Sequence, residues 1–115
     1  MAEGNQWLKI FEKIGEAAAL ELVAEECSEL IHTALKMARI VRGENPTPAD
    51  WDVEYLHLAE EVGDLCNALD VLDEGLMGHD VDLRGDALDR WAPAKMTRWY
   101  RRLFGEEADH ETYET

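Results

Sequence analysis

The sequence predicts an all-α fold, in which an antiparallel helical hairpin completes a four-helix bundle through oligomerisation. Three observations lead to this prediction. Apolar residues recur at three- and four-residue spacing over long stretches, no segment shows the alternation of a strand, and there are only three prolines. With 115 residues, 46% of them hydrophobic, the chain 1–115 is expected to form a single domain with a packed core.

The first two helices follow from this spacing. Residues 5–14 are expected to form an amphipathic helix that ends at Gly15. The second helix is expected over 16–42, about 40 Å at 1.5 Å per residue, and Gly43 ends it. Cys27 lies at the centre of its apolar stripe, which consists of Leu20, Val23, Ala24, Cys27, Leu30, Ile31, Ala34, Ala38 and Val41.

The third helix is expected over 48–75. Thr47 is the predicted N-cap, with Pro48 at the first helical position and Asp50 as the capping-box acid. The apolar stripe of this helix consists of Tyr55, Leu58, Ala59, Val62, Leu65, Cys66, Leu69 and Leu72. Because the loop before it is short, the second and third helices are expected to form an antiparallel hairpin.

The rest of the chain is predicted to be a connection over 76–86, a helix over 87–104 and an acidic, frayed tail over 106–115. The last helix holds five of the eleven basic residues, which suit a helix C-terminus or could reach the acidic hairpin of a neighbour. One hairpin with two further helices makes a thin core. A homodimer or homotetramer is therefore expected.

Composition limits the possible partners. The net charge of −15 disfavours duplex nucleic acid and anionic membranes, which attract basic surfaces. There is no signal-peptide pattern at the N-terminus and no apolar run of about 18 residues. Cys27 and Cys66 fit reduced, buried thiols. A cytoplasmic protein is therefore expected.

Two acidic motifs stand out on the predicted hairpin: Glu25-Glu26-Cys27-Ser28-Glu29 and Glu61-Val62-Gly63-Asp64. Each contains two carboxylates three residues apart, which lie about one turn apart on one helix face. In an antiparallel hairpin all four carboxylates, Glu26, Glu29, Glu61 and Asp64, can converge. Such a cluster would raise its own pKa values, and a hard divalent cation such as Mg²⁺ would relieve the repulsion.

The alternative is that these acids belong to an ordinary solvated surface. Two observations count against it. Like charges three or four residues apart cost about 0.2–0.5 kcal/mol each on a helix, and the same motif occurs on both paired helices. Di-iron bundles use Glu-x-x-His pairs, whereas here the fourth residues are Glu29 and Asp64. An oxygen-only site for a hard metal fits better.

Residues 18–75, with these motifs and the loop Asn45-Pro46-Thr47-Pro48, resemble the MazG-like all-α nucleoside triphosphate pyrophosphohydrolases. The resemblance implies Mg²⁺-dependent hydrolysis of a (d)NTP to the monophosphate and pyrophosphate, with Mn²⁺ as a possible substitute. It also implies that the four carboxylates hold the metal. Glu25 or Glu29 would then help to activate water or accept its proton.

Four further residues are candidates for substrate binding. Lys36, two turns after Glu29, suits a phosphate contact, or is an ordinary solvated lysine. Arg39 and Asn67 are weaker candidates for contacts to the nucleotide. Trp7 could stack on the base, or belong to the core. The competing hypothesis for the whole chain is a non-catalytic helical module for oligomerisation or metal binding.

Overall fold

The computed structural model describes residues 5–105, and every regular element within them is helical. The chain divides into two compact units, one ending at Gly78 and one beginning at His79. The all-α prediction is confirmed. The prediction of a single domain over 1–115 stays a prediction, and the predicted tail 106–115 lies outside the described residues.

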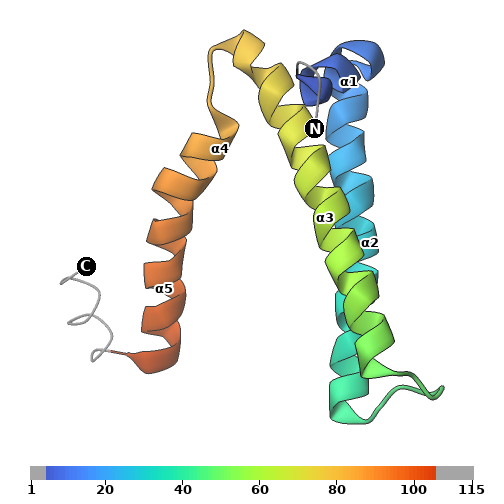
Figure 1. The fold of residues 1–115 in the computed structure, drawn as a ribbon. Coiled ribbons are helices and arrows are strands. Elements are labelled where there is room, and N and C mark those ends of the chain that lie inside the picture. Colours follow the sequence, from blue (N-terminus) through green and yellow to red (C-terminus); the bar gives the residue numbers. More distant parts are fainter. Residues whose placement is uncertain (1–4, 106–115) are drawn as a thin grey trace. The chain divides into compact units, whose positions relative to one another are not determined.

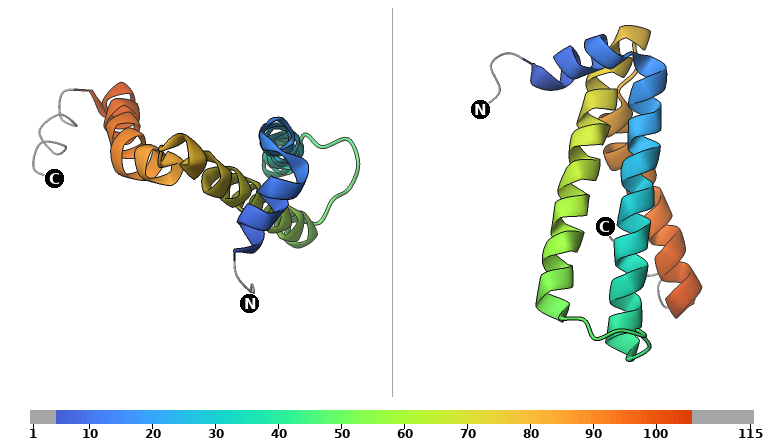
Figure 2. Two further views of the ribbon diagram at one scale, coloured as in Figure 1. Left: turned by 90° about the horizontal axis from the view of Figure 1, so that it is seen from above. Right: turned by 90° about the vertical axis from the view of Figure 1, so that its right-hand side faces the viewer.

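The N-terminal unit contains α1 (Gln6–Ile14), α2 (Glu16–Arg42) and α3 (Trp51–Leu76). Helices α2 and α3 lie side by side and antiparallel, and α1 crosses the end of this hairpin where α2 begins (Figures 1 and 2). Gly15, with φ of +92°, allows the sharp turn between α1 and α2. The predicted antiparallel hairpin is therefore present, and α2 has the predicted bounds.

The helix ends show where local chemistry sets the boundaries. The side chain of Asn5 accepts the Leu8 N–H at 2.9 Å and begins α1. Gly43 adopts the left-handed conformation and ends α2, as the sequence predicts.

The predicted start of α3 is wrong. Thr47 is not the N-cap, because its carbonyl accepts the Asn45 side-chain amide and so belongs to the loop. Instead Asp50 accepts the Asp52 N–H at 2.9 Å, and the helix begins at Trp51. Asp50 therefore caps the helix directly rather than completing a capping box.

Helices α2 and α3 face each other through one row of side chains on each, which we call the hairpin seam. In both helices the row alternates steps of three and four residues, the heptad spacing of packed helices. All of its members are buried or half-buried. They are Ala19, Val23, Glu26, Leu30, Thr33, Met37 and Ile40 on α2, and Glu54, Leu58, Glu61, Leu65, Ala68 and Leu72 on α3.

The seam is not the apolar stripe centred on Cys27 that the sequence suggests. Only Val23 and Leu30 of the predicted α2 stripe belong to it, whereas Leu20, Ile31 and Val41 are exposed. On α3, Leu58, Leu65 and Leu72 belong to the seam, and the other members of the predicted stripe are exposed. The hairpin packs instead through the mixed row that contains Glu26 and Glu61.

Both cysteines are free thiols, but neither is buried within this chain. Cys27 is half-buried and Cys66 is exposed, so the expectation of buried thiols is wrong for the isolated chain. Their helices pack through the adjacent seam and leave them on its margin. None of the helices in the described part of the chain is both long and apolar enough to cross a membrane.

The described part of the C-terminal unit, residues 79–105, is mostly helical. A short 3-10 turn (Met77–His79) follows α3, and the chain becomes helical again at α4 (Leu83–Gly85), where Asp82 caps the Gly85 N–H at 3.0 Å. A π-helical turn (Asp86–Trp91) then leads into α5 (Ala92–Phe104). The predicted last helix is present but begins earlier, inside the predicted connection. The wider π turn precedes Pro93, which has no N–H to donate to the preceding turn.

Two glycines of α3 should respond in opposite ways to replacement by alanine. A Cβ on Gly75 would overlap the Phe11 ring of α1, whereas a Cβ on Gly63 would meet no described atom within 4 Å. We expect Gly75→Ala to destabilise the fold by about 1–3 kcal/mol through overpacking. Gly63→Ala should stabilise it by about 0.5–1 kcal/mol through helix propensity. Urea unfolding of both variants measures the difference, and equal effects would contradict the close packing of α1 on α3.

Candidate metal centre

Four carboxylates converge on the hairpin, two from each helix. Glu26 and Glu29 of α2 and Glu61 and Asp64 of α3 each offer one oxygen, and these four oxygens all lie within 4.8 Å of one another. The three-residue spacing places each pair on one side of its helix, and the antiparallel arrangement brings the pairs level. The structure thus shows the convergence that the two sequence motifs predict.

The two carboxylates that the cluster shares with the seam, Glu26 and Glu61, lie in an environment that disfavours their ionised form. Glu26 Oε2 and Glu61 Oε2 are buried, and neither has a hydrogen-bond partner among the described residues. Burial raises the pKa of Glu26, and the neighbouring charge of Glu29 adds to the shift. The pKa of Glu61 is also raised, first by burial and then by its hydrogen bond and repulsion with Glu29. Buried carboxylate oxygens without partners are costly, and a bound cation would satisfy them.

Glu29 and Asp64 differ from this pair because they are exposed. Each immediately precedes a seam position, and successive residues of a helix are turned by about 100°. Since the helices are antiparallel, the residues that precede seam positions lie on the same side of the hairpin in both. We call this side the polar face. The carboxylate cluster therefore extends from the buried seam to an open surface. A metal ion bound there could take further ligands from solvent or substrate.

Three of the four sequence-predicted substrate residues also lie on the polar face. Lys36 and Arg39 of α2 precede Met37 and Ile40, and Asn67 of α3 precedes Ala68. Glu25 lies on the same face, because it is exposed and precedes the seam residue Glu26. Their common side follows from their register on the two helices, whereas their roles in binding and catalysis stay predictions.

Trp7 reaches this region from α1. Its indole N–H donates to Asn67 Oδ1 at 3.4 Å, and the side chain is 38% exposed. Asn67 follows Asp64 by three residues, so this contact places an aromatic ring about one turn from the carboxylate cluster. An exposed aromatic side chain at this distance is compatible with stacking on a base, which stays a prediction.

Lys36 has a partner that the sequence analysis did not identify. Its Nζ lies 2.9 Å from Glu54 Oε1, and His57 Nδ1 lies 3.3 Å from the other oxygen of the same carboxylate. Glu54 is a buried seam residue of α3. The hydrogen bond from Lys36 is the main cause that lowers the pKa of Glu54, and His57 contributes further. A signal was present in the sequence, because Glu54 precedes Glu61 by seven residues and so occupies the same side of its helix.

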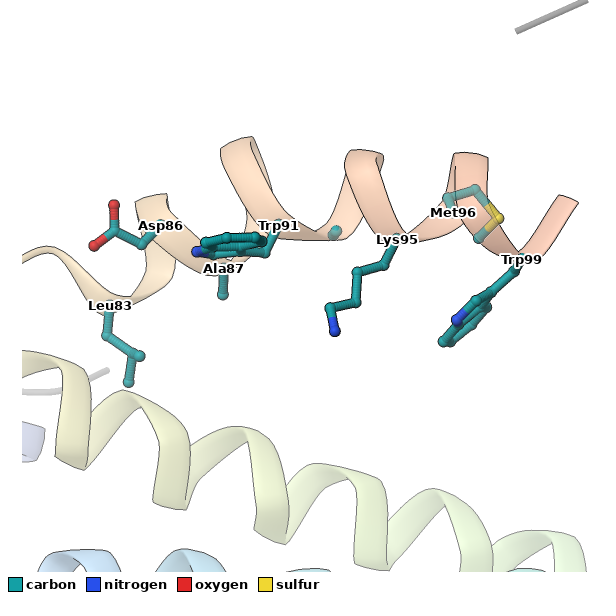
Figure 3. Close-up of a pocket in the computed structure, with 8 residues that line it drawn as sticks. Leu83, Asp86, Ala87, Trp91, Lys95, Met96 and Trp99 are labelled. Atoms are coloured by element: carbon teal, nitrogen blue, oxygen red, sulfur yellow. The ribbon is translucent and has the colours of Figure 1, made fainter. Parts of the chain in front are cut away.

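A concave surface lies on the C-terminal unit. It is a groove of about 520 Å³ lined largely by apolar side chains, among them Leu83, Trp91 and Trp99. In Figure 3, Leu83, Lys95 and Trp99 project from the same side of the helix. The groove contains one lysine and one aspartate, so it lacks the set of oxygen ligands found on the hairpin.

Comparisons of this chain with protein-family models, with curated proteins and with solved structures gave no match. The family resemblance therefore rests on the sequence motifs alone, and the functional argument on the geometry of the site.

The raised pKa values make metal binding sensitive to pH. Cations bind the ionised carboxylates, so protons compete with them as the pH falls through the raised pKa values of Glu26 and Glu61. Without metal, the folded chain holds these protons more tightly than the unfolded chain. The contribution of these two groups to stability therefore falls as the pH rises above their ordinary value of 4.5. We expect Mg²⁺ to raise Tm more at about pH 8 than at about pH 5. Thermal unfolding with Mg²⁺ or with a chelator measures this difference, and an equal shift at both pH values would contradict it.

Proposed function

We propose that this chain is a Mg²⁺-dependent nucleoside triphosphate pyrophosphohydrolase that acts on the cytoplasmic nucleotide pool. It would hydrolyse a (d)NTP to the monophosphate and pyrophosphate. The observation that carries the proposal is the convergence of four carboxylates within 4.8 Å, with two buried oxygens that lack partners in the described part of the chain. A site of this composition suits a hard cation, and the exposed pair leaves it open to an anionic substrate.

Glu26, Glu29, Glu61 and Asp64 would hold the metal. A bound Mg²⁺, or Mn²⁺ in its place, supplies charge neutralisation for the triphosphate and the pyrophosphate leaving group. Glu25 or Glu29 would accept a proton from the attacking water, since both are carboxylates on the open side of the cluster. The water oxygen bonds to the α-phosphorus, the bond from that phosphorus to the bridging oxygen breaks, and the bridging oxygen leaves with pyrophosphate.

The remaining predicted residues would position the substrate. Arg39 would contact a phosphate, Asn67 would contact the nucleotide, and Trp7 would stack on the base. Lys36 would contact the β- or γ-phosphate only if its ammonium left Glu54 or served both groups. Duplex nucleic acid and membranes are not part of this proposal, because of the charge of −15.

A non-catalytic module for oligomerisation or metal binding is the second candidate. The observation that favours it is the amount of exposed apolar surface on the hairpin, including Ile31 and Val41. Under either function we propose a homo-oligomer, a homodimer or homotetramer, in which the hairpin completes a four-helix bundle.

The test is to incubate purified protein and Mg²⁺ with each of the eight common NTPs and dNTPs, and to resolve the products by ion-exchange chromatography. Monophosphate and pyrophosphate, lost on chelation, would support the proposal. Release of diphosphate and phosphate would be consistent with the metal site but would contradict attack at the α-phosphorus. If none of the eight were hydrolysed, the binding module would become the better hypothesis.

A further inference from the structure

His57 of α3 lies on the polar face beside the carboxylate cluster. It immediately precedes the seam residue Leu58, so it is on the same side of the hairpin as Asp64. It also precedes Glu61 by four residues, which places it about one turn from the cluster, toward the loop of the hairpin. Its side chain is 55% exposed. The ring is therefore accessible to a ligand that binds at the cluster and extends toward the loop.

The ring of His57 is held by a buried carboxylate. Its Nδ1 lies 3.3 Å from Glu54 Oε2, while the other oxygen of Glu54 accepts the Lys36 ammonium at 2.9 Å. The hydrogen bond from Lys36 lowers the pKa of Glu54, which favours its ionised form. An ionised carboxylate has no proton to donate, so His57 must carry a proton on Nδ1 to make this contact.

This contact decides what the second ring nitrogen can do. Because Glu54 engages Nδ1, Nε2 of His57 is left for a group outside the chain. In the protonated imidazole, Nε2–H is a cationic donor. A carboxylate that orients a histidine fixes its ring before a ligand arrives, which reduces the entropy lost on binding. An ordinary surface pair would place both partners in solvent, whereas Glu54 is buried in the seam.

The order of residues along the polar face indicates which part of a nucleotide His57 would meet. Trp7 contacts Asn67 on the α1 side of the cluster and is the candidate for stacking on the base. Lysine and arginine occur on the described polar face only on the loop side of the cluster, at Lys36 and Arg39. A nucleotide with its base at the aromatic end and its α-phosphate at the metal would extend its terminal phosphates toward His57.

We infer that His57, oriented by Glu54, donates from Nε2 to the terminal phosphates of the nucleotide. This role rests on the proposed function for the identity of the ligand, and it adds a residue to the proposed substrate contacts. His57 makes and breaks no covalent bond in this role. It stabilises the bound polyphosphate through a charge-assisted hydrogen bond.

The first test is calorimetric titration with inorganic tripolyphosphate and Mg²⁺ at about pH 6.5, where histidine side chains are partly protonated. This probe carries the phosphate chain without base or sugar. We expect His57→Gln to raise its Kd about 10-fold, the loss of one charge-assisted hydrogen bond. His57→Arg keeps a cationic donor and should stay within about 3-fold of the wild type. His79→Gln is the matched control at an exposed histidine beyond the end of α3, and it should leave Kd unchanged.

The second test is the ¹⁵N NMR spectrum of the histidine rings in the wild-type protein. The Nε2 signal of His57, assigned by its absence in either variant, should shift when tripolyphosphate and Mg²⁺ are added, while that of His79 should not. This result decides the question even if His57→Gln does not fold. An unshifted Nε2 would overturn the inference.

Three outcomes of the titration would also overturn the inference. They are no binding of tripolyphosphate by the wild type, the same Kd in the wild type and His57→Gln, and an equal loss of affinity in His57→Gln and His57→Arg. Neither test needs turnover. Absence of hydrolysis with His57-dependent binding would contradict the proposed function and leave the polyphosphate contact standing, whereas hydrolysis with binding indifferent to His57 would do the reverse.

Discussion

Replacing Glu61 with glutamine should greatly reduce Mg²⁺-dependent monophosphate release and raise the Tm of the metal-free protein. The side chain is half-buried, and one of its oxygens has no hydrogen-bond partner in the described structure. Its raised pKa shows that the ionised form is disfavoured by burial and by Glu29. Glutamine removes that charge and its repulsion, but it is a poorer ligand for Mg²⁺. We expect activity to fall by about 100-fold or more while metal-free stability increases.

Glu21→Gln is the matched control, since it makes the same chemical change at an exposed position of α2 outside the carboxylate cluster. It should leave both activity and the effect of Mg²⁺ on Tm close to those of the wild type. Thermal unfolding with and without Mg²⁺ and the chromatographic assay measure both quantities. If metal-free Glu61→Gln were unfolded, the carboxylate would be structural and the metal-site proposal would be wrong. Full retention of activity would remove Glu61 from the ligand set.

The carboxylate cluster was predictable because it depends on only two facts, residue spacing and hairpin topology. Positions three apart share a helix side whatever the helix packs against, and a short loop makes the hairpin antiparallel. The level position of Glu26 and Glu61 can therefore be predicted without any knowledge of the core.

The packing of the hairpin was not predictable in the same way. Each helix carries two rows of heptad spacing that are offset by a single residue. The sequence favours the more apolar row, such as the one centred on Cys27, as the interface. The structure uses the other row, in which Glu26 faces Glu61 and Glu54 forms an ion pair with Lys36 from the neighbouring polar face. The pair of Lys36 and Glu54 joins two helices, so the periodicity of one helix does not reveal it or show which of the two rows faces the partner helix. The Asp50 cap has a local cause instead, because the Thr47 carbonyl accepts the Asn45 side-chain amide within the loop and the Asp50 carboxylate accepts the Asp52 N–H at the start of α3.

Replacing Lys36 with methionine should lower Tm more than replacing Glu54 with glutamine. Lys36→Met leaves the buried carboxylate of Glu54 without the ammonium 2.9 Å away. Glu54→Gln instead removes the charge that requires a partner, and the half-exposed Lys36 can turn to solvent. The double variant should then be more stable than Lys36→Met alone, which a double-mutant cycle of Tm values would show. Additive effects would mean that the two side chains contribute independently.

This ion pair should also give stability a characteristic dependence on pH. The folded pKa of Glu54 is lowered, so its contribution is present above the ordinary value of 4.5 and is lost as the pH falls through the lowered value. The sign is opposite to that of Glu26 and Glu61, whose raised pKa values favour the metal-free fold at mildly acidic pH. In Glu54→Gln the loss of stability in acid should therefore be smaller than in the wild type.

Glu54→Gln also separates the two roles of Lys36. If Lys36 only fixes the packing of α2 on α3, this variant should keep the KM for the nucleotide, since the polar face and its carboxylates are unchanged. If Lys36 also contacts a phosphate, releasing its ammonium from Glu54 should lower KM, because the cation no longer has to leave a carboxylate 2.9 Å away. Lys36→Met should then raise KM even under conditions where it is fully folded. An unchanged KM in both folded variants would remove Lys36 from the proposed substrate site. Its role would then be limited to the packing of α2 on α3.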